Sequence, residues 1–321
     1  MGISQHFSAV SEILEESIKL LPRNGKLVAL IALISSLLYS SLFLLVNFST
    51  NYFTSHMFLK FYSFSLPTTT ALNPSGIPNP FDSITKDVGI LLLVNVFFLL
   101  ATFLVSLFFT ITTVILSSAS CNNKILSGRE MVLKVVKSSW IRPFITSFYT
   151  TLTGVGYIFI VISLSAPLLM FSGTFFVPIS VILAVAAYAF YLFLNVDLIL
   201  ALVVSVMEEK NYGILALGKA GMLIKEKRLQ GFILNVFLAL MNLVLSFMFK
   251  TVLGKKGMAN QRVFLVFVSI FSCLVRIMLL VIYTVVYFRC KKDNGEEIEL
   301  QDSVGYEKLS VEPKLSDAGV V

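Results

Sequence analysis

The sequence predicts an all-α polytopic membrane protein with six transmembrane helices and further amphipathic helices at the cytosolic membrane surface. Hydrophobic residues make up 57% of the 321 residues and charged residues 13%, whereas a soluble domain carries roughly 25% charged residues. The mean hydropathy of +0.88 agrees with this composition. Uncharged stretches recur that are long enough to cross a bilayer core, which needs about 20 apolar helical residues. The composition therefore excludes a secreted disulfide scaffold, a disordered chain and a soluble nucleotide-binding enzyme.

The positions of charges and helix breakers delimit the spans. The uncharged stretch from Pro143 to Val196 is too long for one span, and Pro167, Gly173 and Pro178 divide it into two helices. Each of the other uncharged runs gives one helix. We expect spans at about residues 27–48, 88–118, 145–165, 179–207, 231–249 and 263–288.

The distribution of Lys and Arg predicts how these spans are oriented. Most of the 25 basic residues lie before the first span, between the second and third, between the fourth and fifth, and after the sixth. Loops rich in Lys and Arg remain in the cytosol, so we expect both termini to be cytosolic. The longest loop on the opposite side, residues 49–87, contains Pro67, Pro74, Pro78 and Pro80 and is expected to form no folded domain.

An amphipathic segment precedes the first, third and fifth spans. Residues 1–26 are expected to form a cytosolic surface helix with an apolar face made of Val10, Ile13, Leu14, Ile18 and Leu21. Basic amphipathic segments also occupy residues 127–142, where Trp140 suits the membrane interface, and residues 211–228. Two interpretations remain open. The chain contains three copies of one unit, a surface helix followed by two spans, or it merely has the basic inner loops that any six-span protein requires.

Two stretches carry a resemblance to known membrane proteins. These are SGREMVLKVVKSSWIRPF (Ser127 to Phe144) and NYGILALGKAGMLIKEKRLQGF (Asn211 to Phe232), together with an acidic tail. With them the chain resembles a family of plant six-span membrane proteins of unassigned function. More distantly, it is similar to the membrane domain attached to some glycerophosphodiester phosphodiesterases. The resemblance runs from about Leu20 to Arg289 and implies the six-span topology; it implies no catalytic residue and no hydrolytic activity.

Two charged residues fall inside predicted spans, where charges are costly and usually face the interior of the bundle. Asp197 in the fourth span and Arg276 in the sixth are expected at similar depth near the bilayer midplane. An ion pair between them is therefore feasible. The alternative is that each binds a backbone carbonyl, a water molecule or another polar side chain.

Asparagines add to this intramembrane polar group. Asn195 lies in the fourth span, and Asn235 and Asn242 lie seven residues apart on one face of the fifth. One interpretation is hydrogen bonding between helices, and the other is a solvated cavity or substrate path. We favour hydrogen bonding, because conducting proteins usually place more acidic residues or broken helices at the midplane.

The remaining candidate sites are short signals at the cytosolic side. Cys121 and Cys290 lie at helix ends, where reversible palmitoylation and an unmodified buried thiol are alternative interpretations. Residues 289–321 are acidic and poor in large apolar residues, so we expect a disordered cytosolic tail. Within it, Tyr306 and Leu309 fit a tyrosine-based sorting signal.

Searching for reactive groups gives no catalytic constellation, cofactor motif or metal site, so we expect no enzymatic activity. We expect a non-enzymatic integral protein of the endomembrane system or plasma membrane that organises lipid or recruits cytosolic partners. Its partners would be membrane lipids, anionic ones in particular, and cytosolic proteins that bind the tail; nucleic acid is not expected. The alternative is a carrier or channel for small solutes or ions that uses Asp197 and Arg276.

Overall fold

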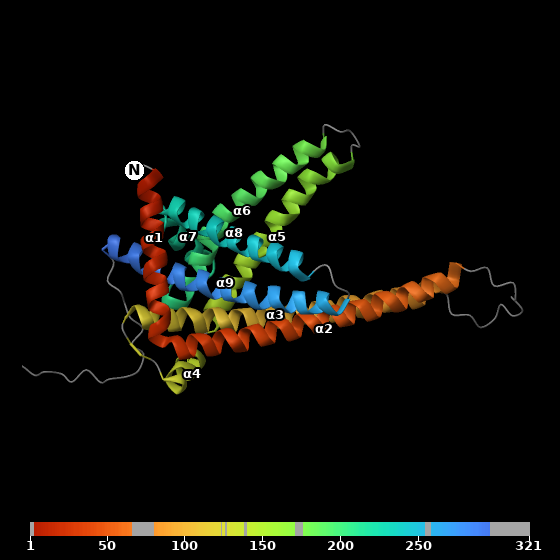
Figure 1. Ribbon diagram of the computed structural model, residues 1–321, viewed down its shortest axis with the longest axis horizontal. Coiled ribbons are helices and arrows are strands. Elements are labelled where there is room, and N and C mark those ends of the chain that lie inside the picture. The colour runs from red at the N-terminus through yellow and green to blue at the C-terminus, as the bar shows by residue number, and fades with distance from the viewer. Residues whose placement is uncertain are drawn as a thin grey trace, which may run out of the picture.

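The computed structural model describes residues 3–65, 80–122, 124–125, 127–137, 140–170, 176–253 and 258–295 of the chain. All regular secondary structure in these residues is helical (Figure 1). Six of the described helices are long and apolar enough to cross a membrane. The predicted all-α fold class with six membrane-spanning helices is thereby confirmed.

The helices follow one another in three similar units. Each unit is a short helix followed by a hairpin of two long helices, which is the order that the proposed threefold repeat requires. The first unit comprises α1 (Ile3–Leu20), a 3₁₀ turn (Leu21–Asn24), α2 (Gly25–Ser65) and α3 (Pro80–Cys121). The second comprises α4 (Gly128–Lys137), α5 (Ile141–Met170) and α6 (Phe176–Met207), and the third α7 (Ile214–Leu223), α8 (Arg228–Leu253) and α9 (Met258–Asp293).

The first hairpin extends well beyond its predicted spans: residues 49–65 and 80–87, which were predicted to belong to the loop, are helical. Helix α2 continues to Ser65, and α3 already begins at Pro80. The physical reason is that neither glycine nor proline interrupts the chain between Gly25 and Pro67, so nothing ends the helix at the apolar boundary. Pro80 itself occupies the first position of α3, where its missing N–H costs nothing. The prolines at 67, 74 and 78 lie outside the described residues.

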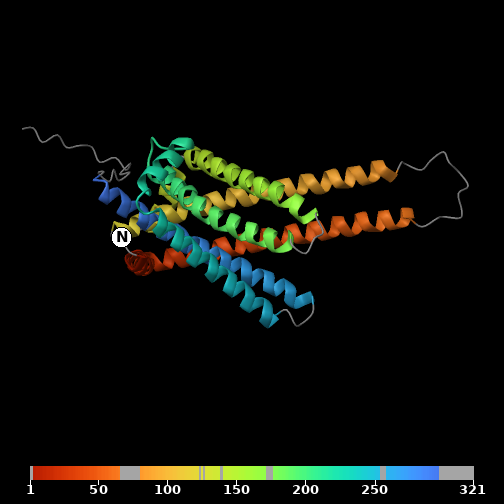
Figure 2. The same cartoon turned by 90° about the horizontal axis from the view of Figure 1, so that it is seen from above.

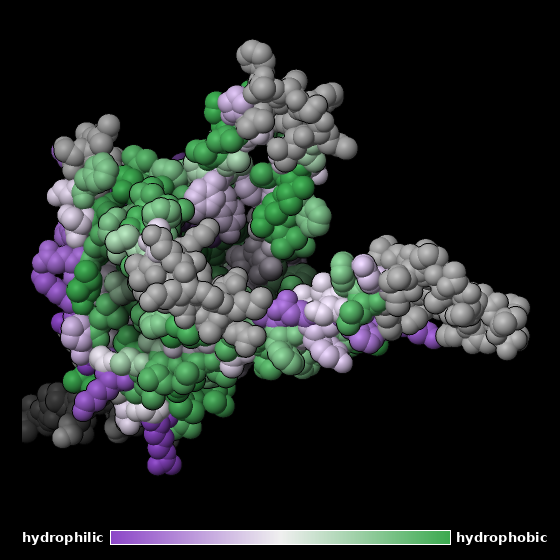
Figure 3. All heavy atoms as spheres, turned by 45° about the vertical axis from the view of Figure 1, so that its right-hand side comes forward, coloured by the Kyte–Doolittle hydropathy of each residue, from purple (hydrophilic) through white to green (hydrophobic). Residues whose placement is uncertain are grey.

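The three hairpins are joined at one end and diverge toward the other (Figures 1 and 2). We call the joined end the base: it comprises α1, α4 and α7 together with the adjoining ends of the long helices. Helix α1 crosses these ends instead of running along the bundle (Figure 1). Hydrophilic side chains gather along the edge formed by the base, whereas the long helices are largely apolar on the surface (Figure 3).

The hydrophobic core lies next to the base. Its largest fully buried side chains come from the halves of α3, α6, α8 and α9 nearest the base and include Ile111, Leu200, Leu234, Ile282, Tyr283 and Tyr287. Toward the other end of the hairpins, large apolar side chains such as Phe48, Leu93 and Leu99 are exposed. Such a surface suits contact with lipid acyl chains, for which exposed apolar residues carry no penalty.

Helices α6 and α8 come together at a glycine. An added Cβ atom at Gly231 would lie 2.7 Å from Cγ1 of Val196, which is closer than nonbonded carbon atoms approach. Gly231 therefore allows the first turns of α8 to pack directly on α6. This contact also fixes which face of α6 meets α8, and so determines the surroundings of Asp197.

We expect Gly231→Ala to lower the thermal unfolding midpoint of the detergent-solubilised protein. Overpacking costs about 1–3 kcal/mol, and the roughly 1 kcal/mol gained in helix propensity offsets only part of it. Gly154→Ala is the matched control, because an added Cβ there meets nothing within 4 Å. The double variant Gly231→Ala/Val196→Ala should recover part of the loss. A single variant at Gly231 as stable as the control would contradict the close packing.

Candidate functional site

A buried carboxylate, Glu208, organises the polar side chains of the base. It follows the last residue of α6, and its side chain is 11% exposed. Tyr287 donates a hydrogen bond to its Oε1 at 2.7 Å, and Asn211 donates one to its Oε2 at 2.6 Å. The ammonium groups of Lys219 and Lys291 lie 3.0 and 3.4 Å from the carboxylate oxygens. One carboxylate thus joins the end of α6 to α7 and α9.

The environment of Glu208 keeps this carboxyl ionised. Burial by itself tends to raise its pKa, but hydrogen bonds from Tyr287, Asn211 and Lys219 and the charge of Lys219 outweigh burial, so the pKa lies below its ordinary value. Lys291, which is 7% exposed and lies over the Tyr287 ring at 5.8 Å, depends on this negative charge for compensation. The group therefore has the properties of a structural ion-pair cluster.

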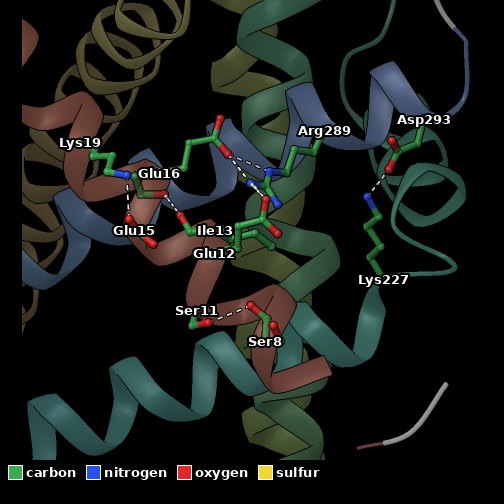
Figure 4. Close-up of polar contacts among 11 residues, drawn as sticks. Ser8, Ser11, Glu12, Ile13, Glu15, Glu16, Lys19, Lys227, Arg289 and Asp293 are labelled. Atoms are coloured by element: carbon green, nitrogen blue, oxygen red, sulfur yellow. Dashed lines mark hydrogen bonds and ion pairs between the residues drawn. The ribbon is translucent and has the colours of Figure 1, made fainter. Parts of the chain in front are cut away.

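Around this cluster, further ion pairs attach α1 and the α7–α8 turn to α9. Arg289 donates to Glu16 at 2.8 Å and to Glu12 at 3.2 Å, so that the guanidinium lies between two acidic side chains of α1 (Figure 4). Lys227 forms an ion pair with Asp293 at the end of α9 (Figure 4). The acidic side chains are largely exposed, so each pair contributes at most about 1 kcal/mol, but together they set the position of α1 across the base.

A second connection joins α5 to the segment before α7. Gly213 has a φ of +61°, a conformation that residues with a side chain rarely adopt, and its N–H donates to Thr146 Oγ1 at 2.8 Å. Nearby, Arg142 lies 3.6 Å from Glu209. Glycine is thus required where the chain leaves α6 and turns into α7.

Asp197 and Arg276, the two charged residues expected near the midplane, do not pair with each other. Asp197 accepts a hydrogen bond from Arg228, the first residue of α8, at 3.0 Å. Its neighbour Val196 meets Gly231, so this part of α6 faces the start of α8 and not Arg276 on α9. The Arg228 guanidinium also lies 6.0 Å from the centre of the Phe193 ring. The charge on Asp197 is therefore compensated from the base side.

Arg276 has a different environment. Its side chain is exposed near the middle of α9, and its guanidinium donates to the Ser106 hydroxyl of α3 at 2.5 Å. No carboxylate in the described part of the chain pairs with it. Arg276 is thus a cation held by a neutral partner.

The three candidate asparagines differ in role. Asn235 is buried, donates to the carbonyl of Leu192 at 3.0 Å and accepts from the Tyr283 hydroxyl at 3.0 Å. It joins α8 to α6 and α9, as the hydrogen-bonding interpretation expects. Asn195 is half-buried, and Asn242 lines a groove of about 610 Å³ between α6, α8 and α9. Ser246, Ser272 and Tyr188 add polar groups to the same groove.

The cytosolic signals receive little support. Cys290 is only 2% exposed and belongs to the hydrophobic core, and Cys121 is half-buried against it, so both fit the interpretation as unmodified buried thiols better than palmitoylation. Tyr306, Leu309 and the rest of the predicted tail from residue 296 onward lie outside the described residues. In the described part of the chain, no group of three or more His, Cys, Asp or Glu residues could hold a metal ion.

The sequence analysis missed Glu208, Lys291, Arg228 and Arg289 as interacting residues. It used charges at the helix ends only to orient the spans. One signal was present: Glu208 is an acidic residue directly after an apolar run, within a segment that is otherwise rich in lysine. Acidic residues at a helix end that is followed by several cations are good candidates for an ion-pair cluster.

We expect Glu208→Gln to destabilise the protein at neutral pH by about 3 kcal/mol or more, since it leaves Lys291 buried without a counter-charge. Because the folded-state pKa of Glu208 is lowered, its stabilising contribution is present above the ordinary pKa of glutamate and is lost as the pH falls through the folded value. The thermal unfolding midpoints of wild type and variant should therefore converge in acid. Glu226→Gln, at an exposed position in the α7–α8 turn, is the control. A constant difference between the two proteins across the pH range would contradict this role.

Comparison with known proteins identifies a family and no characterised relative. The family model described as "Domain of unknown function (DUF8558)" matches residues 4–311, which is nearly the whole chain. No curated protein and no solved structure matches the chain. The match includes all three units and the whole base. The chain therefore belongs to the DUF8558 family.

Proposed function

We propose that the protein is a non-enzymatic integral membrane protein of the endomembrane system or plasma membrane whose base binds anionic lipid headgroups on the cytosolic leaflet. The observation that carries the proposal is that α4 and α7 each leave an apolar face uncovered beside exposed cations of the base. Amphipathic helices with this character lie in the headgroup region of a membrane.

Helix α4 supports the proposal most directly. Met131 packs with residues of α2 and α3, and Val135 belongs to the main hydrophobic core, whereas Val132, Leu133 and Val136 are exposed on the adjoining face. An exposed apolar face on a short helix is unfavourable in water but favourable against acyl chains. Helix α4 lies at the base, beside the ends of the long helices (Figure 1), which supports contact of this face with a membrane surface.

Helix α7 has a similar division. Ala216 and Ala220 are buried against the core, whereas Ile214, Leu215 and Met222 are exposed. The two helices belong to the second and third units, so equivalent elements of the proposed repeat present the same kind of surface. Helix α1 is different, because it packs across the base and pairs with α9 through Glu12 and Glu16.

Cations accompany these apolar faces. Lys26 at the start of α2, Arg129 in α4 and Lys225 after α7 are exposed, one in each unit, and none forms an ion pair with a described residue. A basic residue near an anionic leaflet contributes about 1 kcal/mol of binding free energy. The positive-inside rule supports placing this end, and with it both termini, in the cytosol. Recruitment of cytosolic proteins by the acidic tail is a further part of the proposal.

The resemblance to other membrane proteins that we infer from two sequence stretches agrees with the proposed membrane-surface role of α4 and α7. Helices α4 and α7 lie within the stretches Ser127 to Phe144 and Asn211 to Phe232. These stretches carry the inferred resemblance to plant six-span proteins and to the membrane domain of glycerophosphodiester phosphodiesterases. We infer that a shared surface-helix and hairpin unit underlies the resemblance. Such a unit accounts for membrane association and carries no hydrolytic activity.

We expect the triple variant Lys26→Gln/Arg129→Gln/Lys225→Gln to lower the selectivity for anionic lipid severalfold, at about 1 kcal/mol per cation. Trp140, the single tryptophan, lies at the base beside Phe108 and is a natural energy donor. The measurement is energy transfer from Trp140 to dansyl-phosphatidylserine or dansyl-phosphatidylcholine in vesicles containing the full-length protein. Lys86→Gln, at the opposite end of α3, is the matched control. Equal selectivity in the triple variant and the control would refute headgroup binding by the base.

A carrier or channel is the second candidate, and the groove lined by Asn242 is the observation that favours it. Its proposed charge pair is not available, because Asp197 bonds to Arg228 and Arg276 to Ser106. The groove is also open on one side and includes apolar residues such as Phe247 and Val268, as a lipid-filled groove would.

We expect Asn242→Cys to resist a membrane-impermeant thiol reagent in sealed vesicles, because lipid and not water fills the groove. A membrane-permeant maleimide should label the same variant, which controls for burial within the protein. The wild-type protein, with Cys121, Cys273 and Cys290 half-buried or buried, gives the background. Labelling by the impermeant reagent would instead indicate a water-filled path and favour the carrier.

A further inference from the structure

Arg276 is a membrane-depth cation without a counter-charge among the described residues. It stands near the middle of α9, so each half of the helix extends about 25 Å from it at 1.5 Å per residue. With a hydrocarbon core of about 30 Å, this places the guanidinium well inside the bilayer. The other charged residue expected at this depth, Asp197, is occupied by Arg228. Among the described residues, Arg276 has the Ser106 hydroxyl as a partner and no carboxylate.

Most of the hydrogen-bond donors of Arg276 have no partner among the described residues. A guanidinium has five N–H donors in a planar fork, and the Ser106 hydroxyl takes one of them. An exposed arginine inside a bilayer is costly unless it reaches acceptors. Phosphate oxygens match the fork and bind it in a bidentate manner, which makes phosphate a better partner than a neutral hydroxyl.

A groove between α6, α8 and α9 ends close to Arg276 along α9. Ser272 lines the groove and lies one helical turn from Arg276 on the same face of α9. Asn242 and Ser246 of α8 and Tyr188 of α6 supply further polar groups along it. The α5–α6 hairpin diverges from α8 and α9 beyond the base (Figures 1 and 2). The polar side chains of the groove thus extend to within one helical turn of Arg276.

We propose that Arg276 binds the phosphate of an anionic phospholipid whose headgroup enters this groove. The polar side chains of the groove receive the headgroup, and the apolar walls, including Leu243, Phe247 and Val268, receive the acyl chains. Charge complementarity selects an anionic lipid, because no described carboxylate near Arg276 pairs with a cationic choline group. A soluble phosphate ion would gain nothing from the apolar walls. The site is separate from the cations of the base in both residues and depth.

The test measures binding of phosphatidylglycerol and phosphatidylcholine to the full-length protein in detergent by native mass spectrometry. We expect the first phosphatidylglycerol to bind more tightly than phosphatidylcholine and to remain bound at high salt, because screening is weak in an apolar site. Arg276→Gln should weaken this first binding about tenfold, the usual worth of a hydrogen-bonded charge. Arg276→Lys, which keeps the charge but not the fork, should have an intermediate affinity.

Two further variants keep the test decisive. Ser272→Leu fills the groove one turn from Arg276 while leaving the cation in place, and it should also weaken the first phosphatidylglycerol, even if Arg276→Gln fails to fold. Arg129→Gln removes a cation of the base and should weaken only salt-sensitive binding. If Arg129→Gln leaves the salt-sensitive binding unchanged, that result contradicts lipid binding by the base and leaves the Arg276 site unaffected.

Three results would overturn the proposal. The first is an unchanged affinity of folded Arg276→Gln or of Ser272→Leu for phosphatidylglycerol. The second is equal binding of phosphatidylcholine and phosphatidylglycerol by the wild-type protein. The third is competition by soluble glycerol phosphate, which would identify a site for free anions in place of a lipid site.

Discussion

The carboxylate of Glu208 is the interaction on which the arrangement of the base depends. It forms ion pairs with two lysines from different helices and accepts hydrogen bonds from Tyr287 and Asn211, so α6, α7 and α9 are fixed at one point. The hydrophobic core lies directly beside it, and α1 is held across it by Arg289. Beyond this level the hairpins separate (Figure 2), and many of their large apolar side chains are exposed. Packing between distant segments is therefore concentrated at the base, whereas the surfaces of the hairpin ends are largely exposed.

The spans and surface helices could be predicted because apolar length and helical spacing are local properties of the sequence. The extension of α2 from residue 49 to Ser65 could not be predicted in the same way. Hydropathy marks where a helix leaves lipid but not where it ends, and only the absence of glycine and proline before Pro67 indicated a longer helix. The order of three surface helices and three hairpins was predictable as a pattern. Their joining at the base was not, because it depends on contacts between distant segments.

For the polar residues inside the spans, the sequence predicted their depth along each helix but not which neighbouring helix they contact. Counting residues from the helix ends placed Asp197 and Arg276 at similar heights but gave no direction around each helix. Direction is set by packing: Gly231 brings α8 against Val196, and Arg228 thereby reaches Asp197 first. Asn235 was assigned correctly as a helix-joining residue. Its partners, a carbonyl of α6 and a hydroxyl of α9, could not be named from one sequence.

The length of the first hairpin gives the base a mechanical consequence. Helix α3 has 42 residues and is therefore about 63 Å long at 1.5 Å per residue. The part of α3 beyond the core, from Leu107 to Pro80, is about 40 Å long, so a tilt of about 5° at its fixed end moves its tip by about 3.5 Å. A small change in the packing of the base would thus produce a larger displacement at the far end of the first hairpin.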